Sequence, residues 1–385
     1  MSAEAGKRTT TTAEREIVWV DSPEKLRQML TRLMQEPRVA VDTESDNMFA
    51  YRESVALLQF STPHQDFLVD PKSDIPMEEL GAFFADPAIE KIFHAAEYDL
   101  IGLWRDYRFR VNHIFDTMQA SRILGKERVG LAALLQTYFG VTLDKRWQRA
   151  DWSKRPLPEE QLAYAVYDTR YLIPLRDILY RELVQRGLWE LAQEDFLRLS
   201  QPKEIDHSFD PESFWRLPGV DDLSPEQLRL LRTLYIWREE EAQRRDVPPF
   251  KVMHNRELVA LARRLPHTLA QVKAFLGPRR ARQRKLVSGL WQAIQRAAKE
   301  DIPVRPRRRP RPSQDYIQRL ERLRAWRRER ARALGVESDI VLPREAMERL
   351  AREAPQRLEE LEAMDVLGPV RLRTYGEDIL RLLRK

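Results

Sequence analysis

The sequence predicts a mixed α/β domain followed by two small all-helical domains. Its 385 residues exceed the length of one ordinary domain. Over the first 200 residues, short apolar or β-branched segments alternate with segments of helical periodicity. Beyond residue 224 only the helical periodicity remains, and a pattern of about 75 residues occurs twice there.

The expected sheet is mixed because several strands follow one another first and then alternate with helices. In DSPEKLRQMLTRLMQ (21–35), Ser22 and Pro23 precede an apolar stripe with a 3.6-residue period, which predicts a helix. EYDLIGLWRDY (97–107) predicts another helix, and 116–200 is expected to be mainly helical. The expected strands are EIVWV (16–20), RVAVDTE (38–44), VALLQFST (55–62), DFLVD (66–70) and EKIFHA (90–95).

The all-helical part contains an internal repeat with an offset of 89 residues. LYIWREEEAQRRDVPP (234–249) aligns with LRAWRRERARALGVES (323–338), with a tryptophan at the same place in each. LVALARRLPHTL (258–269) aligns in the same way with MERLAREAPQRL (347–358). An alignment this extended indicates a duplicated domain.

Polar and proline-containing segments mark the expected domain boundaries. QPKEIDHSFDPESFWRLPG (201–219) interrupts the helical pattern. DIPVRPRRRPRPSQ (301–314) contains four Pro and five Arg, so an extended conformation is expected. The predicted organisation is a disordered tail (1–15), an α/β domain (16–200), a linker (201–223), a first helical domain (224–300), a basic linker (301–314) and a second helical domain (315–385).

Charge is distributed unevenly along the chain. Residues 1–250 contain 33 Lys and Arg against 43 Asp and Glu, a net charge of −10. Residues 251–385 contain 33 Lys and Arg against 17 Asp and Glu, a net charge of +16. The basic part is a candidate for binding a polyanion, and a solvated arginine-rich helical surface is the alternative. Charge alone favours neither interpretation.

The composition excludes several classes of protein and site. The chain has no Cys, which excludes disulfides, thiolate catalysis and Cys-ligated zinc. No segment approaches the roughly 18–20 apolar residues of a membrane-spanning helix. The N-terminal segment lacks the apolar core of a secretory signal, and its acidic residues disfavour a transit peptide. We therefore expect a cytoplasmic protein.

Acidic residues adjoin apolar segments at several places in the α/β domain. Asp42 and Glu44 lie two residues apart at the end of an expected strand, so they share one face of it. Asp99 opens the helix that follows EKIFHA. Asp168 lies in LAYAVYDTRYL, four residues after Tyr164 and on the same helix face. Clustered, buried carboxylates repel one another and lose solvation, so they need a function that offsets this cost.

Four carboxylates in one place suit the hydrolysis of a phosphodiester with two metal ions. Such ions lie about 3.5–4 Å apart and clamp the attacking and leaving oxygens. Mg²⁺ and Mn²⁺ prefer carboxylate oxygens and water. The predicted metal ligands are Asp42, Glu44, Asp99 and Asp168, with Asp42 shared by both ions. A tyrosine titrates near 10 and is a poor general base at neutral pH, so Tyr164 is expected to position the attacking water.

Each of these residues also has an ordinary structural explanation. Two acids at a strand end often form a surface pair or a helix N-cap. Asp99 could cap its own helix, and Tyr164 could belong to the core. Asp168 could pair with Arg170 or Arg176. The combination in this order is far more specific than any single member.

The motifs resemble those of the DEDD exonucleases, and specifically of the ribonuclease D family. VDTES carries the first motif, IFHAAEYDLIGL resembles the second, and YAVYDTRYL resembles the third, Tyr-x-x-x-Asp. A related branch has His five residues before the last Asp, where this chain has Ala163, so the tyrosine branch is indicated. The second motif also offers Glu97, but its spacing favours Asp99. Asp116 is interpreted as a support of the site or of the fold.

The helical repeats resemble HRDC domains, which are modules shared by ribonuclease D and RecQ-type helicases. Two of them after an exonuclease domain is the ribonuclease D arrangement, so the resemblance covers nearly the whole chain. It implies a ribonuclease-H-like fold for 16–200 and 3′→5′ release of nucleoside 5′-monophosphates with Mg²⁺ or Mn²⁺. The implied substrate is RNA, including tRNA precursors with free 3′ ends and other structured RNA, and a monomer is expected.

Two other functions stay open at this stage. A DNA exonuclease would use the same chemistry, although the tandem HRDC-like modules favour RNA. A non-catalytic nucleic-acid-binding scaffold would not need all four acids and Tyr164, which are present. The basic segments GPRRARQRK (277–285) and RPRRRPR (305–311) are candidates for contacts with backbone phosphates. The modules could instead serve protein contacts or architecture.

Overall fold

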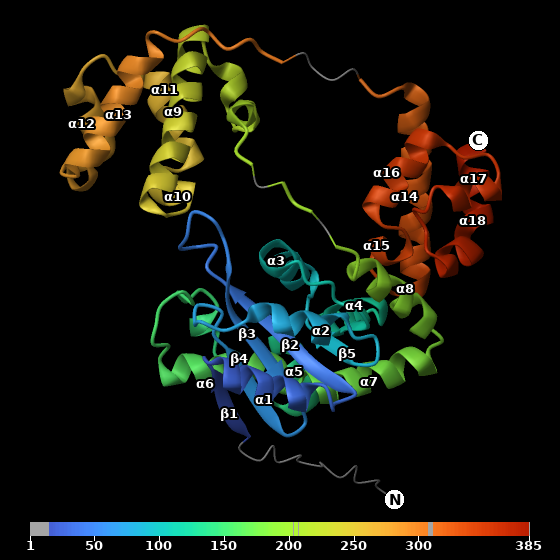
Figure 1. Cartoon of the computed structure of the whole chain (residues 1–385). Coiled ribbons are helices and arrows are strands. Elements are labelled where there is room, and N and C mark those ends of the chain that lie inside the picture. Colours follow the sequence, from blue (N-terminus) through green and yellow to red (C-terminus); the bar gives the residue numbers. More distant parts are fainter. Residues whose placement is uncertain (1–14, 203, 207, 307–310, 385) are drawn as a thin grey trace, which may run out of the picture. The chain divides into compact units, whose positions relative to one another are not determined.

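The structure of the chain is a computed structural model (Figure 1). It describes residues 15–202, 204–206, 208–306 and 311–384. The expected disordered tail therefore lies, except for residue 15, outside the described residues. The chain forms two compact units. The first contains the segment up to Ser45, Val55–Glu204 and the segment from Arg311 onward, and the second contains Asp46–Ser54 and Ile205–Pro310.

A mixed sheet of six strands forms the centre of the first unit, as the sequence predicts. The strand order is β1-β4-β3-β2-β5-β6. The pairs β1–β4, β2–β5 and β5–β6 are parallel, whereas β2–β3 and β3–β4 are antiparallel. The strands are β1 Glu16–Val20, β2 Arg38–Ser45, β3 Val55–Ser61, β4 Gln65–Val69, β5 Glu90–Phe93 and β6 Ile114–Asp116.

Helices cover both faces of this sheet. Ser22 accepts a hydrogen bond from the backbone N–H of Lys25 and so begins α1, as predicted. β6 and α2 were not predicted, because they are only three and six residues long and show no clear period. The helices are α1 Pro23–Leu33, α2 Leu80–Ala85, α3 Glu97–Tyr107, α4 Thr117–Ile123, α5 Leu131–Phe139, α6 Glu159–Arg170, α7 Leu172–Gln185 and α8 Trp189–Leu199.

Alternation along β2 assigns its side chains to the two faces of the sheet. Val39 and Val41 pack in the core under α1, α2 and α3. Ala40 packs in the opposite core, with residues of α4, α7 and α8. The period of two continues past these fully buried residues, so Asp42 and Glu44 lie on the same face of the sheet as Ala40. Thr43 lies on the opposite face, which α3 covers.

The first unit also contains the second helical domain. It has its own core, which includes Leu323, Leu350 and Ile379. Its helices are α14 Gln314–Leu334, α15 Ser338–Val341, α16 Arg344–Glu353, α17 Leu358–Ala363 and α18 Pro369–Arg384.

The N-terminus of α18 contacts α8 of the α/β domain. The backbone N–H of Val370 donates to Glu194 Oε2 at 2.7 Å. The guanidinium of Arg371 bonds to Glu194 and to Asp195, the latter at 2.8 Å. A Cβ on Gly368 would overlap the Glu194 carboxylate, so only glycine allows this approach. All three charged side chains are buried, which makes the contact an interior ionic network.

The second unit contains the first helical domain. Four apolar residues from the stretch expected to be a linker, Phe214, Leu217, Val220 and Leu223, lie in its core. In the segment Asp46–Ser54, the Tyr51 hydroxyl donates to Glu239 at 2.7 Å. The helices are α9 Pro225–Arg245, α10 Pro249–Val252, α11 Asn255–Arg264, α12 Leu269–Ala281 and α13 Arg284–Ala297.

The two helical domains have the same internal construction, which confirms the predicted repeat. α9 and α14 are both 21 residues long, and α11 and α16 are both 10, each pair offset by 89. In the first domain Arg238 donates to the backbone carbonyl of Met253, and in the second Arg327 donates to that of Leu342, again 89 residues on. Within the described residues, none of the helices has the length and apolar character needed to cross a bilayer.

Candidate active site

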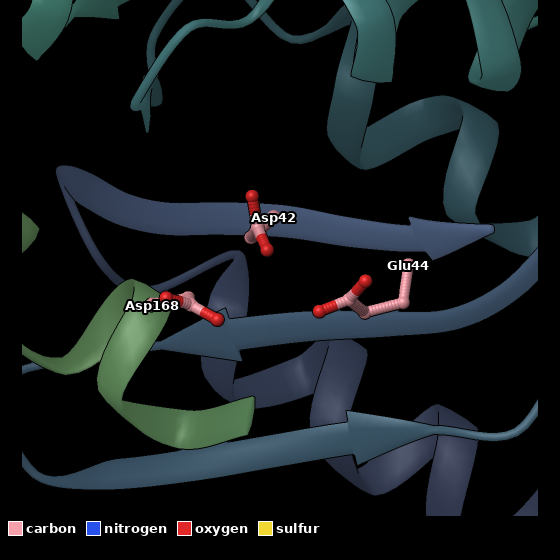
Figure 2. A group of neighbouring side chains, drawn as sticks. All are labelled: Asp42, Glu44 and Asp168. Atoms are coloured by element: carbon pink, nitrogen blue, oxygen red, sulfur yellow. The ribbon is translucent and has the colours of Figure 1, made fainter. Parts of the chain in front are cut away.

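Three of the predicted site carboxylates meet beside the end of β2. Asp42 and Glu44 project from β2, and Asp168 projects from α6 (Figure 2). One carboxylate oxygen of each residue lies within 4.8 Å of those of the other two. Their meeting follows from the strand period of β2 and from α6, whose buried Ala165 and Val166 pack against β3 and β4.

Asp99 lies next to this group and is held by the strand residue between the two acids. It is in the first turn of α3 and is buried. Its Oδ1 accepts hydrogen bonds from the Thr43 backbone N–H at 3.0 Å and from the Thr43 hydroxyl at 2.6 Å. Because Ala96 occupies the N-cap position of α3, Asp99 does not cap its helix. Glu97, the other acid of this motif, is exposed.

Burial and mutual repulsion raise the pKa of these carboxylates. Burial, followed by Asp99, Asp168 and Glu44, raises the pKa of Asp42 well above its ordinary value. Burial, followed by Asp168 and Asp99, does the same for the pKa of Glu44. The pKa of Asp168 rises to about 7, through burial and Asp99. Without cations the cluster would therefore retain protons near neutral pH.

Burial raises the pKa of Asp99 as well, to about 7, against the opposing effect of its hydrogen bonds from Thr43. Asp116 adds to the rise. Asp99 therefore interacts electrostatically with the same group. It is not one of the three residues, Asp42, Glu44 and Asp168, whose carboxylate oxygens lie within 4.8 Å of one another.

Tyr164 is buried on α6 and lines the same pocket as the carboxylates. Its hydroxyl has a hydrogen bond with Gln148. Burial, then the charges of Asp168, Glu44 and Asp42, raise its pKa above the ordinary value near 10. The phenol is therefore neutral at physiological pH and can donate a hydrogen bond.

The arginines that could have paired with Asp168 bind other acids. Arg170 bonds to Asp66 at 2.6 Å, and Arg176 bonds to Glu90 at 2.7 Å. Within the part of the chain that the structure describes, no lysine or arginine forms an ion pair with Asp42, Glu44 or Asp168. An all-oxygen donor set without a neutralising side chain suits a hard divalent cation.

Asp116 supports the turn that carries Asp99. It caps α4 by accepting hydrogen bonds from the backbone N–H groups of Met118 and Gln119. It also accepts from the N–H groups of Ala95 and Ala96, the residues just before α3. A buried carboxylate with four such donors fixes the position of two helix starts at once.

The site opens into a pocket of about 650 Å³. Three of its polar residues were not predicted as part of the site, namely His94, Gln148 and Arg149. His94 lies in IFHAAEYD, directly after β5, and the other two lie in WQRADW, before α6. Only their position inside the motif segments could have predicted that these three residues belong to the site, since neither periodicity nor charge distinguishes them.

Comparison with known proteins places these features in a family. Residues 17–184 match the family described as 3'-5' exonuclease, and residues 227–294 and 317–383 each match the HRDC domain. A ribonuclease D of Acidiphilium cryptum is 30% identical over 376 residues, which cover 95% of this chain and 93% of that protein. The exosome complex exonuclease RRP6 of Saccharomyces cerevisiae is 34% identical over 264 residues, 65% of this chain.

The RRP6-type relatives are much longer than this chain. The matched region spans only 36% of the yeast protein and 32% of its human counterpart, exosome complex component 10. Among solved structures, Escherichia coli RNase D superposes with a TM-score of 0.68 at 23% identity, over 96% of this chain and 99% of that one. This structural likeness supports the fold of the whole chain.

Proposed function

Because this chain belongs to the ribonuclease D family, we propose that it is a 3′→5′ exoribonuclease that releases nucleoside 5′-monophosphates. One observation carries the proposal: three carboxylates, which form no ion pair with any lysine or arginine that the structure describes, meet within 4.8 Å in a pocket that Tyr164 also lines. Such an arrangement is costly unless divalent cations compensate it.

We assign the metal ligands to Asp42, Glu44, Asp99 and Asp168, and the ions to Mg²⁺ or Mn²⁺. When bound, the two ions stabilise charge that develops on the phosphate and make water more acidic. Asp42 is assigned as the ligand that both ions share. Glu44 is assigned to the ion on the side of the attacking water.

Tyr164 positions the attacking water in this proposal and does not remove its proton. Its raised pKa makes the phenolate too scarce to act as a base. A neutral hydroxyl, oriented by Gln148, can hold the water at a fixed angle to the phosphate.

Family membership also guides the finer proposals. We infer that the chain acts as a cytoplasmic monomer on RNA with free 3′ ends, including tRNA precursors. We further propose an exonuclease domain over 16–200, HRDC domains over 224–300 and 315–385, and a linker at 301–314. The segment 201–223 connects the first two domains, and its end packs in the core of the first helical domain.

A direct assay distinguishes the proposed activity from its alternatives. RNA with a 5′ label should shorten one nucleotide at a time in Mg²⁺, release nucleoside 5′-monophosphates and stop in EDTA. A DNA strand of the same sequence should be degraded more slowly. Equal or faster degradation of DNA would favour the DNA exonuclease, and binding without any mononucleotide would favour the scaffold.

The basic surface of the first helical domain supports a second part of the proposal, contacts with the RNA backbone. Arg279, Arg282, Arg284 and Lys285 are all exposed. Arg284 and Lys285 also line a pocket between α9 and α13, beside Arg244 and Arg296. Of the other basic segment, 305–311, residues 307–310 lie outside the described residues.

Salt dependence of binding tests this surface. Replacing Arg279, Arg282 and Lys285 by Ala should weaken RNA binding and reduce the slope of log affinity against log salt by about 2, since each single-strand phosphate contact contributes about 0.7. The matched control replaces Arg324, Arg328 and Arg332, which are exposed on α14, and should change the slope less. Equal changes in both variants would contradict a specific role for the segment.

A further inference from the structure

His94 lines the candidate active-site pocket, and the proposed hydrolysis gives it no part. It follows β5 directly, five residues before Asp99. Among the described residues, it is not in the group of side chains whose ligand atoms meet at one point. A contribution to metal binding is therefore not what explains its position.

A chain of two hydrogen bonds through the buried Thr117 defines which ring nitrogen of His94 carries the proton. The ring Nδ1 lies 2.9 Å from the Thr117 hydroxyl oxygen, and that hydroxyl lies 3.0 Å from the backbone carbonyl oxygen of Phe93. The carbonyl can only accept, so the Thr117 hydroxyl donates to it. Nδ1–H must then donate to Thr117, and only this arrangement satisfies both contacts with the single hydroxyl proton.

The second ring nitrogen, Nε2, consequently has a free lone pair. Thr117 is fully buried and holds the Nδ1 edge of the ring, so the other edge faces the pocket that His94 lines. Nε2 has no hydrogen-bond partner among the residues that the structure describes. Burial lowers the pKa of His94 to about 4, so the ring is neutral at physiological pH and Nε2 can accept.

A neutral acceptor in this pocket selects for a donor on the substrate. Phosphate oxygens are acceptors and gain nothing from it. The donors on the bases differ among the four nucleotides, so an exonuclease that removes any nucleotide cannot depend on them. Ribose hydroxyls are donors that every nucleotide of RNA shares, and the 2′-hydroxyl is what distinguishes RNA from DNA.

We propose that Nε2 of His94 accepts a hydrogen bond from a ribose hydroxyl of the nucleotide being removed. The inference rests on the proposed exonuclease function and extends it to recognition of the sugar. If the hydroxyl is the 2′, His94 contributes to the choice of RNA over DNA. If it is the 3′, His94 recognises a free chain end.

Substrates that differ only in the last nucleotide test the proposal. Four oligoribonucleotides would end in a normal ribose, a 2′-deoxyribose, a 2′-O-methylribose or a 3′-deoxyribose, and kcat/KM would be measured for each. Wild type should prefer the normal ribose by about tenfold over the analogue that lacks the recognised hydroxyl, because that analogue leaves the Nε2 acceptor unpaired in the complex. In His94→Phe the ratio of kcat/KM between these two substrates should fall toward one. His94→Gln, which keeps an acceptor oxygen, should restore part of the preference.

Two controls separate recognition from structural damage. His64→Phe makes the same change at an exposed residue in the β3–β4 turn and should keep the wild-type preference. Thr117→Val removes the partner of Nδ1 and should weaken the same preference as His94→Phe. A loss by one common factor on all four substrates, or no loss on any, in His94→Phe would overturn the proposal.

A binding measurement without turnover allows the inference to fail separately from the proposed activity. Nitrogen NMR of the wild-type protein should show His94 protonated at Nδ1, with Nε2 shifting on addition of a ribonucleoside 5′-monophosphate. The shift should be smaller with the analogue that lacks the recognised hydroxyl. Equal shifts with all analogues would overturn the inference, whereas a wild type that binds selectively but releases no mononucleotide would overturn only the proposed function.

Discussion

Two clusters of carboxylates in the first unit, one buried and one half-buried, are compensated in different ways. At α8, Glu194 and Asp195 are both bonded to the guanidinium of Arg371. At β2 and α6, Asp42, Glu44 and Asp168 meet without an ion pair to any lysine or arginine that the structure describes. The first cluster contains its own counter-charge, and the second does not.

The difference indicates what each cluster is for. A buried ion pair that is complete within the chain fixes how two domains pack. A group of carboxylates that lacks a counter-charge raises its own pKa values and destabilises the fold, unless cations from solution supply the charge. The α8 cluster therefore suits a role in architecture, and the β2 cluster suits the proposed binding of metal ions.

The largest expected effect is a loss of activity, and a matched pair of substitutions, Asp168→Asn and Asp195→Asn, distinguishes the two clusters. Asp168→Asn should lower the rate of mononucleotide release by roughly 10²–10³-fold, the range for removal of one electrostatic contribution to a transition state. It should leave stability equal or higher, because repulsion is relieved. Asp195→Asn should keep most activity and lose stability, as shown by urea unfolding. The comparison fails if both variants lose activity and stability in parallel.

Arg371→Met should give the next largest effect. It leaves Glu194 and Asp195 buried without their partner, so the free energy of unfolding should fall by about 3–5 kcal/mol. The control is Arg373→Met, two residues along α18, where the ion pair with Glu190 is exposed and worth at most about 1 kcal/mol. Equal losses in the two variants would show that burial of the Arg371 network does not matter.

Divalent cations should stabilise the protein through the β2 cluster alone. At a concentration of 100 times Kd, Mg²⁺ should raise the free energy of unfolding by about 2.7 kcal/mol per site. Thermal unfolding with and without EDTA measures the increment. It should vanish in Asp42→Asn, because Asp42 is assigned to both ions, and persist in Arg371→Met. Persistence in both variants would place the ions elsewhere.

Stability in EDTA should also depend on pH. Asp99 and Asp168 have folded pKa values of about 7, against roughly 4 in the unfolded chain. The folded state therefore binds more protons between about pH 4 and 7, and its stability should fall as pH rises through that window, by up to about 1.4 kcal/mol per pH unit for each of the two groups. Asp168→Asn should flatten the slope, and an unchanged slope would contradict the assignment.

Local rules were enough to predict much of this site. The period of two along β2 places Asp42 and Glu44 together, and the helical period of α6 places Tyr164 near Asp168. The sheet and the repeat were equally predictable, because each rests on patterns within short segments. Asp46, the next acid along the chain, begins a turn and is buried, and it accepts hydrogen bonds from Ser54.

Contacts between distant segments explain what the sequence did not predict. Thr43 holds Asp99 across 56 positions, and Arg371 meets Asp195 across 176. Neither pair shows a local pattern, since nothing near an arginine indicates which acid it will meet. The hydrogen-bond chain of His94 likewise depends on β5 and β6 lying side by side, which only the folded sheet establishes.

Binding of Mn²⁺ tests the central claim, that the uncompensated carboxylates are a metal site, most directly. Calorimetric titration of the wild-type protein should show two ions bound per chain. Asp42→Asn should lose both, because Asp42 is assigned to both, whereas Asp195→Asn should bind two as wild type does. A wild type that binds no Mn²⁺, or an Asp42→Asn variant that still binds two, would contradict the account.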